Sequence, residues 1–151
     1  MMFQGRHFQN AYITRDFEKG LATFKAHGLE PHMTHDADIE VQTRQGPQRM
    51  VNRIAFIWQG DLQYELIQPV SGLGGFYTDV LPADDSLRFH HVCSRVDDWD
   101  KFRSSIDESR LVLEGGHDAL RFCYLDARDI VGHYLEFNWM VPQMWTAIGG
   151  R

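Results

Sequence analysis

QNAYITRD at residues 9–16 and HVCSRVDD at residues 91–98 are the two stretches that decide the fold, because they fill matching places in a pattern that the chain uses twice. In each stretch the residues alternate as in a strand, and an acidic residue, Asp16 or Asp98, stands seven positions after the first residue. Aspartate is a preferred N-cap, so each stretch predicts a strand that leads into a helix. The offset between the stretches is constant (91 − 9 = 82 and 98 − 16 = 82), which predicts an internal duplication.

The residues after each stretch repeat one order of elements. Apolar residues at helical spacing mark one buried helix face in each half: Phe17, Leu21 and Phe24 in the first, and Trp99, Phe102 and Ile106 in the second. In the first half, residues 53–58 and 62–68 predict a hairpin, while the polar stretch 30–48 predicts a short strand and an exposed loop. In the second half three strands are predicted, at residues 111–113, 120–125 and 132–139.

The predicted fold class is α+β, with a single domain over residues 1–151. Two βαβββ modules, at about residues 5–70 and 87–141, are expected to pair into a curved, cleft-forming arrangement of two facing sheets. A glycine-rich connector at residues 70–86 joins them, and a tail that begins near Pro142 packs on the sheet or closes one end of a pocket. The open sheet edges and the apolar tail of such modules predict a homodimer.

Composition limits the classes of function. The formal charge is 15 − 21 = −6 with neutral histidines, and the lysines and arginines are scattered, so a nucleic-acid partner is not expected. Cys93 and Cys123 lack C-x-x-C spacing, which argues against a disulfide framework and a thiolate zinc site and favours reduced, cytoplasmic thiols. Residues 1–7 lack the apolar segment of a signal peptide, and no run of about 18 apolar residues occurs. We expect a cytoplasmic protein with no membrane partner and a small-molecule substrate.

Strand alternation predicts which polar side chains meet. Gln9 and Glu65 fall on the less apolar faces of their strands in the first half, and His91 and Glu136 do so in the second. The more apolar faces are expected to take the helices, which leaves these four side chains on the concave side. A buried carboxylate there is costly without a cation or a proton. One amide, one imidazole and two carboxylates can together hold a divalent metal ion.

Other interpretations of these residues stay open. His7 shares the strand parity of Gln9 and is an alternative first ligand, whereas His90 has the opposite parity and is expected to be structural. Each glutamate taken alone is equally consistent with a solvated residue on an open sheet face, and it is the repeat that favours the ligand interpretation. Five side chains are candidates for a substrate pocket, with membership of the core as the alternative: Phe76, Tyr124, Tyr134, Met144 and Trp145.

The phrases ELIQP at residues 65–69, HHV at 90–92 and GHYLE at 132–136 accompany the four candidate ligands and the seven-residue step. Together they resemble the vicinal oxygen chelate superfamily, the fold of glyoxalase I, methylmalonyl-CoA epimerase, extradiol dioxygenases and bleomycin-resistance proteins. The resemblance covers nearly the whole chain, and the overall sequence is most similar to the epimerase-like branch. That branch typically has His, Gln, His and Glu as ligands. The set found here is instead similar to that of zinc-using glyoxalase I enzymes: Gln9, Glu65, His91 and Glu136.

The resemblance implies a metal-dependent lyase, isomerase or epimerase that chelates a carbonyl substrate and forms an enediolate or enolate. It implies Glu136 as the first candidate for proton transfer and Glu65 as the second. The ion would be zinc, nickel, cobalt or manganese, with iron disfavoured. Two alternatives remain: an extradiol-type dioxygenase, which needs two histidines and one carboxylate for Fe(II), and a metal-free small-molecule binding or resistance protein.

Overall fold

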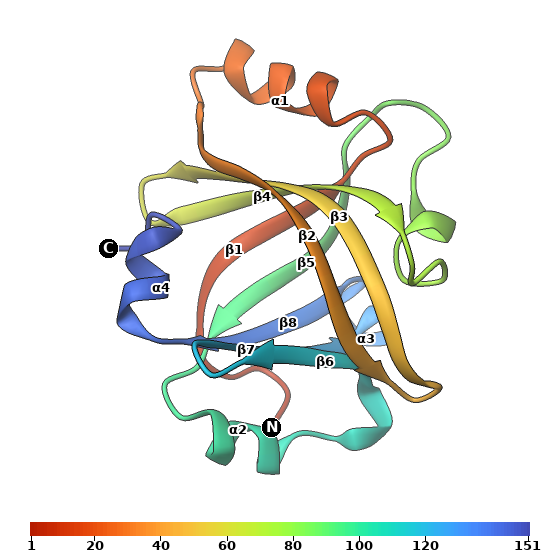
Figure 1. Cartoon of the computed structure of the whole chain (residues 1–151), viewed down its shortest axis with the longest axis vertical. Helices are drawn as coiled ribbons and strands as arrows, with labels where there is room; N and C mark the ends of the chain where they lie inside the picture. Colours follow the sequence, from red (N-terminus) through yellow and green to blue (C-terminus); the bar gives the residue numbers. More distant parts are fainter.

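The computed structural model describes all residues, 1–151, as an eight-stranded sheet that closes into a barrel with a few short helices around it (Figure 1). Around the barrel the strands follow the order β1-β4-β3-β2-β6-β7-β8-β5. The strands are β1 (Arg6–Ile13), β2 (Pro31–Thr43), β3 (Gly46–Gln59), β4 (Leu62–Ser71), β5 (Arg88–Arg95), β6 (Leu111–His117), β7 (Leu120–Asp126) and β8 (Tyr134–Met140). The helices are α1 (Phe17–Ala26), α2 (Trp99–Ser105), α3 (Arg128–Val131) and α4 (Pro142–Ala147), with 3₁₀ turns η1 (Thr78–Val80) and η2 (Glu108–Arg110). The expected curved sheet is present, but it is one continuous barrel rather than two facing sheets.

The two halves of the chain share the order strand, helix and three strands, with η2 and α3 added in the second half. β1 lies parallel to β4, β5 lies parallel to β8, and β1 and β5 are antiparallel neighbours. The β1–β4 pair places Ala11 opposite Glu65, and the β5–β8 pair places Cys93 opposite Glu136. Because 93 − 11 is again 82, the strand registers agree with the repeat that the sequence predicts.

Each of the two central strands carries one extra residue. The register between β1 and β5 shifts at Phe8, which lies between His7 and Gln9, and again at His90, which directly precedes His91. A bulge leaves the extra residue without an opposite partner and interrupts the alternation of faces. Phe8 and His90 are both buried, so the face parity read from the sequence does not hold on the N-terminal side of either bulge.

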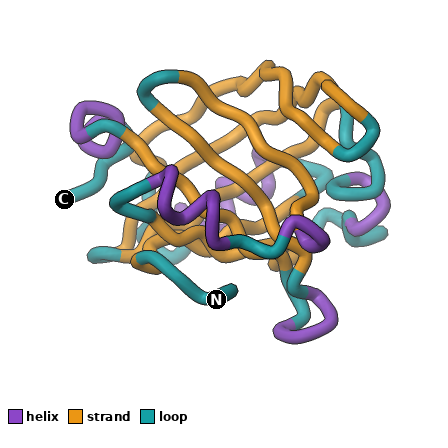
Figure 2. The backbone as a smooth tube through the Cα atoms, turned by 90° about the horizontal axis from the view of Figure 1, so that it is seen from below, coloured by secondary structure: helices purple, strands orange, loops and turns teal.

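Helices α1 and α2 cover opposite outer sides of the barrel, and Figure 2 shows the strands wrapping around a common interior with helices outside them. Asp16 and Asp98 cap these helices, each accepting a hydrogen bond from the backbone N–H three residues on. This confirms both predicted helix starts. Leu66 of β4 packs in the outer cluster beneath α1, and Phe137 of β8 packs against Phe102 of α2. The more apolar strand faces therefore take the helices, as predicted.

Residues 30–48 are not the predicted exposed loop. They form β2 and the first residues of β3, which pair along their length as a long hairpin. Its outer face carries exposed charged side chains such as Asp38 and Arg49, which pair across the two strands, and this polar composition resembles that of a loop. On its other side β2 pairs with β6 through only Gln42 and Thr43, so most of that edge has no strand partner.

Two segments outside the repeat close the two ends of the barrel. The connector that contains η1 brings Phe76 and Tyr77 into the interior core at one end, and α4 crosses the opposite end (Figure 1). Met144 and Ile148 of the C-terminal segment face the interior. None of the helices has the length and apolar character that a membrane crossing requires.

Candidate metal centre

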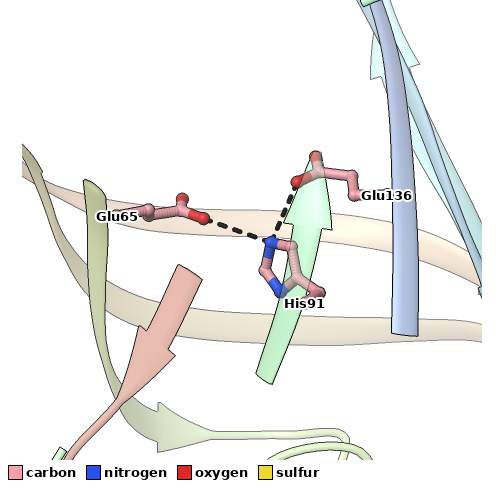
Figure 3. A group of neighbouring side chains, drawn as sticks. All are labelled: Glu65, His91 and Glu136. Carbon is pink, nitrogen blue, oxygen red and sulfur yellow. Dashed lines mark ion pairs between the residues drawn. The ribbon is translucent and has the colours of Figure 1, made fainter. Parts of the chain in front are cut away.

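Three of the four predicted ligands meet inside the barrel: Glu65 from β4, His91 from β5 and Glu136 from β8 (Figure 3). One nitrogen or oxygen atom of each lies within 4.8 Å of the other two. His91 Nε2 is 3.4 Å from Glu65 Oε2 and 3.1 Å from Glu136 Oε2, and the two carboxylates approach this nitrogen from different sides. The His91 side chain is completely buried, so these three groups interact with little screening by water.

The charges of this cluster are coupled. Burial by itself lowers the pKa of His91, but the carboxylates of Glu136 and Glu65 outweigh burial and raise it to about 9. Burial raises the pKa of Glu65, although His91 opposes this. Two carboxylates with one imidazolium carry a formal charge of −1 in a nearly dry site, which is an unfavourable state. A divalent cation in place of the imidazolium proton would make the cluster neutral.

Gln9 lies on β1, is buried and faces the same interior. Its Nε2 donates a hydrogen bond of 2.7 Å to Gln63 Oε1, while its Oε1 is buried without a hydrogen-bond partner. Glu65 Oε2 also lacks a partner with hydrogen-bond geometry. Unpaired buried acceptors are rare and costly. One amide oxygen, one imidazole nitrogen and two carboxylates on the same cavity are a donor set that fits a divalent metal ion.

The cluster opens on an interior cavity of about 430 Å³. Most of its lining residues are hydrophobic, including Phe56 of β3 and Phe122 of β7, and Met144 and Ile148 close it at the α4 end. The polar groups are few, which is typical of a site that binds a small molecule with an apolar body and orients it through a few specific contacts.

The structure separates the five predicted pocket residues. Tyr124 and Met144 line the cavity. Phe76 and Tyr134 do not, because they pack on each other in the core at the connector end, with ring centroids 4.7 Å apart. Trp145 lines a separate pocket together with Trp58 and Arg95.

The two other histidines of these strands differ from the expectation based on parity. His7 is exposed on the outer surface, because the bulge at the next residue turns it away from the interior. His90 lies inside, with Nδ1 2.9 Å from His91 Nδ1 and Nε2 2.7 Å from the carbonyl oxygen of Phe76. Burial lowers the pKa of His90 to about 3, and the charge of His91 acts in the same direction. His90 is therefore a neutral residue in direct contact with a candidate ligand.

Sequence reasoning assigned no role to three polar residues of the interior: Gln63, Asn52 and Tyr77. Asn52 is 1% exposed, and neither its Nδ2 nor its Oδ1 has a hydrogen-bond partner. Burial raises the pKa of Tyr77, with Glu65 and Glu136 adding to the effect. The inward position of Asn52 could have been found from the sequence, because Asn52 alternates with the apolar residues Met50 and Ile54 on one face of its strand.

Comparison with known proteins identifies the family. The model of the Glyoxalase/Bleomycin resistance protein/Dioxygenase superfamily matches residues 8–124. The chain belongs to this superfamily, which confirms the vicinal oxygen chelate assignment made from the sequence. A search of curated proteins found no match.

Solved structures share the fold over nearly the whole chain. A hypothetical protein from Bacillus halodurans superposes with a TM-score of 0.65 at 16% identity, covering 91% of this chain and 96% of the other. A variant of methylmalonyl-CoA epimerase from Streptomyces coelicolor, in complex with 2-nitronate-propionyl-CoA, gives 0.62 at 16% identity, with 93% and 97% covered. The methylmalonyl-CoA epimerase from Mycobacterium tuberculosis gives 0.61 at 15% identity, with 97% of each chain covered. At such identities the likeness shows the fold alone.

Proposed function

We propose that the chain is a metal-dependent enzyme of the isomerase, epimerase or glyoxalase-type lyase class. It would remove a proton beside a substrate carbonyl and return it, by way of an enolate or enediolate. The observation that carries the proposal is the pair of carboxylates, Glu65 and Glu136, placed around one imidazole on the wall of an apolar cavity. Two bases around one site suit removal of a proton at one position and its delivery at another. The fold shared with methylmalonyl-CoA epimerases supports this class.

Four residues would hold a divalent ion such as zinc, nickel, cobalt or manganese: Gln9, Glu65, His91 and Glu136. The bound ion would supply Lewis acidity that makes a C–H next to a substrate carbonyl acidic. Glu136 is the first candidate for the base, because its side chain is the more accessible of the two, at 12% exposed against 8% for Glu65. Glu65 would hold the proton on the other side, and the amide of Gln9 would bind without adding negative charge.

The cavity supports a substrate with an apolar substituent. Its hydrophobic lining and its volume of about 430 Å³ suit a small carbonyl compound or the acyl part of a thioester. An extradiol-type dioxygenase is less well supported, because His91 brings one imidazole to the cluster and both nitrogens of His90 are already engaged. A metal-free binding protein would leave the buried Gln9 Oε1 without a partner.

Two measurements test the proposal. Elemental analysis of protein purified without added metal should find a divalent ion, and the protein should exchange a substrate α-proton with D₂O under anaerobic conditions. The panel comprises hemithioacetals of methylglyoxal, 2-methyl-branched acyl thioesters and catechols. Glu136→Gln should lower exchange by about 10²-fold or more. Glu40→Gln, at an exposed position of β2, is the matched control and should have no effect. Oxygen consumption with a catechol and no exchange with any carbonyl compound would reject the proposal.

A further inference from the structure

Two candidate ligands each contact a buried residue that is itself held by a backbone carbonyl. Gln9 is bonded to Gln63, and His91 is bonded to His90. We infer that Gln63 and His90 are positioning residues that fix the metal-facing atoms of Gln9 and His91, and that the segments closing the barrel ends are thereby coupled to the metal centre. The inference rests on the proposed function, since it concerns the ion proposed there.

The first series of bonds determines which end of the Gln9 amide faces the cavity. The carbonyl oxygen of Ile148 can only accept, so the group of Gln63 that lies 3.3 Å from it must be the Nε2 donor. The Oε1 of Gln63 then faces Gln9 and can only accept, so Gln9 must donate its own Nε2–H to it, at 2.7 Å. The remaining atom, Gln9 Oε1, is left buried and unpartnered on the cavity side. An amide binds a metal ion through oxygen, so the series presents the correct atom.

The second series determines the tautomer of His91. The carbonyl oxygen of Phe76 accepts from His90 Nε2 at 2.7 Å, which places the proton of the neutral His90 ring on Nε2. His90 Nδ1 is then an acceptor, and His91 Nδ1, 2.9 Å away, must donate to it. Nε2 of His91, the nitrogen nearest both carboxylates, is therefore the one available to a metal ion. Ligating histidines are commonly oriented in this way by a bond from the other ring nitrogen.

Both carbonyls belong to segments outside the repeat. Ile148 follows α4, and its carbonyl also accepts a 2.7 Å bond from Trp58 Nε1. Phe76 lies in the connector at the opposite end of the barrel (Figure 1). Each end segment, when packed against the barrel, thus fixes the orientation of one ligand side chain. Displacement of the α4 segment would free the Gln9 amide to rotate, and displacement of the connector would free the His91 imidazole.

Titration with Co²⁺ tests the two roles, with affinity and the visible absorption spectrum of the bound ion as readouts. Gln63→Met and His90→Phe keep similar shape and remove the bonds, so each should weaken Co²⁺ binding by about 10- to 100-fold and change the spectrum. Gln63→Glu, protonated at this buried position, keeps an acceptor for Gln9 and a donor for the Ile148 carbonyl, and it should retain affinity within about threefold. Gln42→Met and His117→Phe, at exposed positions, are matched controls that should bind normally.

A double-mutant cycle separates positioning from general damage to the fold. In a Gln9→Leu background, Gln63→Met should cause no further loss of Co²⁺ affinity, because Gln63 acts only through Gln9. An additional loss of the same size, or unchanged affinity in the single variants, overturns the inference. If Gln63→Met does not fold, Gln63→Glu keeps it testable: loss of Co²⁺ binding at an unchanged unfolding temperature also overturns it.

The same titrations separate this inference from the proposed function. If the unmodified protein does not bind Co²⁺, or if Glu136→Gln binds it equally well, the metal centre itself is wrong. If those two results are as expected and the Gln63 and His90 variants bind normally, only the positioning role is wrong.

Discussion

Asn52→Leu is expected to stabilise the metal-free protein. The Asn52 side chain is 1% exposed and faces a mostly hydrophobic cavity, and neither atom of its amide has a hydrogen-bond partner. An unpaired buried polar group costs about 1–3 kcal/mol, and an apolar group of the same shape removes that cost. Because the Asn52 amide also lies beside the Tyr77 hydroxyl, where it opposes the burial that raises the pKa of Tyr77, some of the gain is lost. We therefore expect the free energy of unfolding to rise by about 1–2 kcal/mol, the lower part of that range.

Urea and thermal unfolding measure this gain. The urea midpoint should rise at an unchanged m-value, and the melting temperature should rise by about 2–8 °C for a chain of this size. Asn138→Leu is the matched comparison, since only its Oδ1 is unpartnered and its Nδ2 donates to Cys93 Sγ at 3.2 Å. It should gain less. A loss of stability in Asn52→Leu, or an equal gain in both variants, would refute the reasoning and show that the Asn52 amide is satisfied in solution.

Four further outcomes are expected. Metal binding must displace a proton from His91, whose pKa is about 9. The apparent Co²⁺ affinity, measured by competition titration, should therefore rise about tenfold per pH unit between pH 7 and 9 and level off above pH 9. Affinity independent of pH would argue against His91 as a ligand. Chelation of the ion should lower the melting temperature, and re-addition should restore it. Gly149→Ala should destabilise the fold by about 1–3 kcal/mol in urea titrations, because Gly149 has φ +91° and a Cβ there would lie 2.6 Å from Trp58 Nε1. Light scattering should show the homodimer predicted from the sequence, and a monomer at high concentration would exclude it.

The periodic features of this chain were readable from its sequence. The repeat, the helix starts at Asp16 and Asp98, and the inward faces of Glu65 and Glu136 all follow from spacing and alternation. Each of these features depends on interactions between residues close together within one strand or helix. The superfamily was named from a resemblance of motifs, and the match over residues 8–124 confirms it.

What the sequence did not predict depends on partners distant along the chain. The bulge at His90 arises from pairing with another strand, so counting alternate residues placed this side chain on the wrong face. Residues 30–48 of the β2–β3 hairpin were predicted as a short strand and an exposed loop, because the exposed outer face of the hairpin carries charges. The bonds from Gln63 to Ile148 and from His90 to Phe76 end on backbone carbonyls, which every residue possesses and no sequence pattern marks.

The two bulges supply different groups to the two halves of the candidate metal centre. Phe8 and His90 occupy equivalent places beside Gln9 and His91. His90 gives its neighbour a hydrogen-bond acceptor, but Phe8 has none to offer, and the amide of Gln9 relies on Gln63 of the adjacent strand instead. A histidine introduced at Gln9 would thus inherit no acceptor for its second ring nitrogen from the bulge. Its second ring nitrogen would have to donate to Gln63, as the Gln9 amide does, unless a change at Phe8 supplied an acceptor.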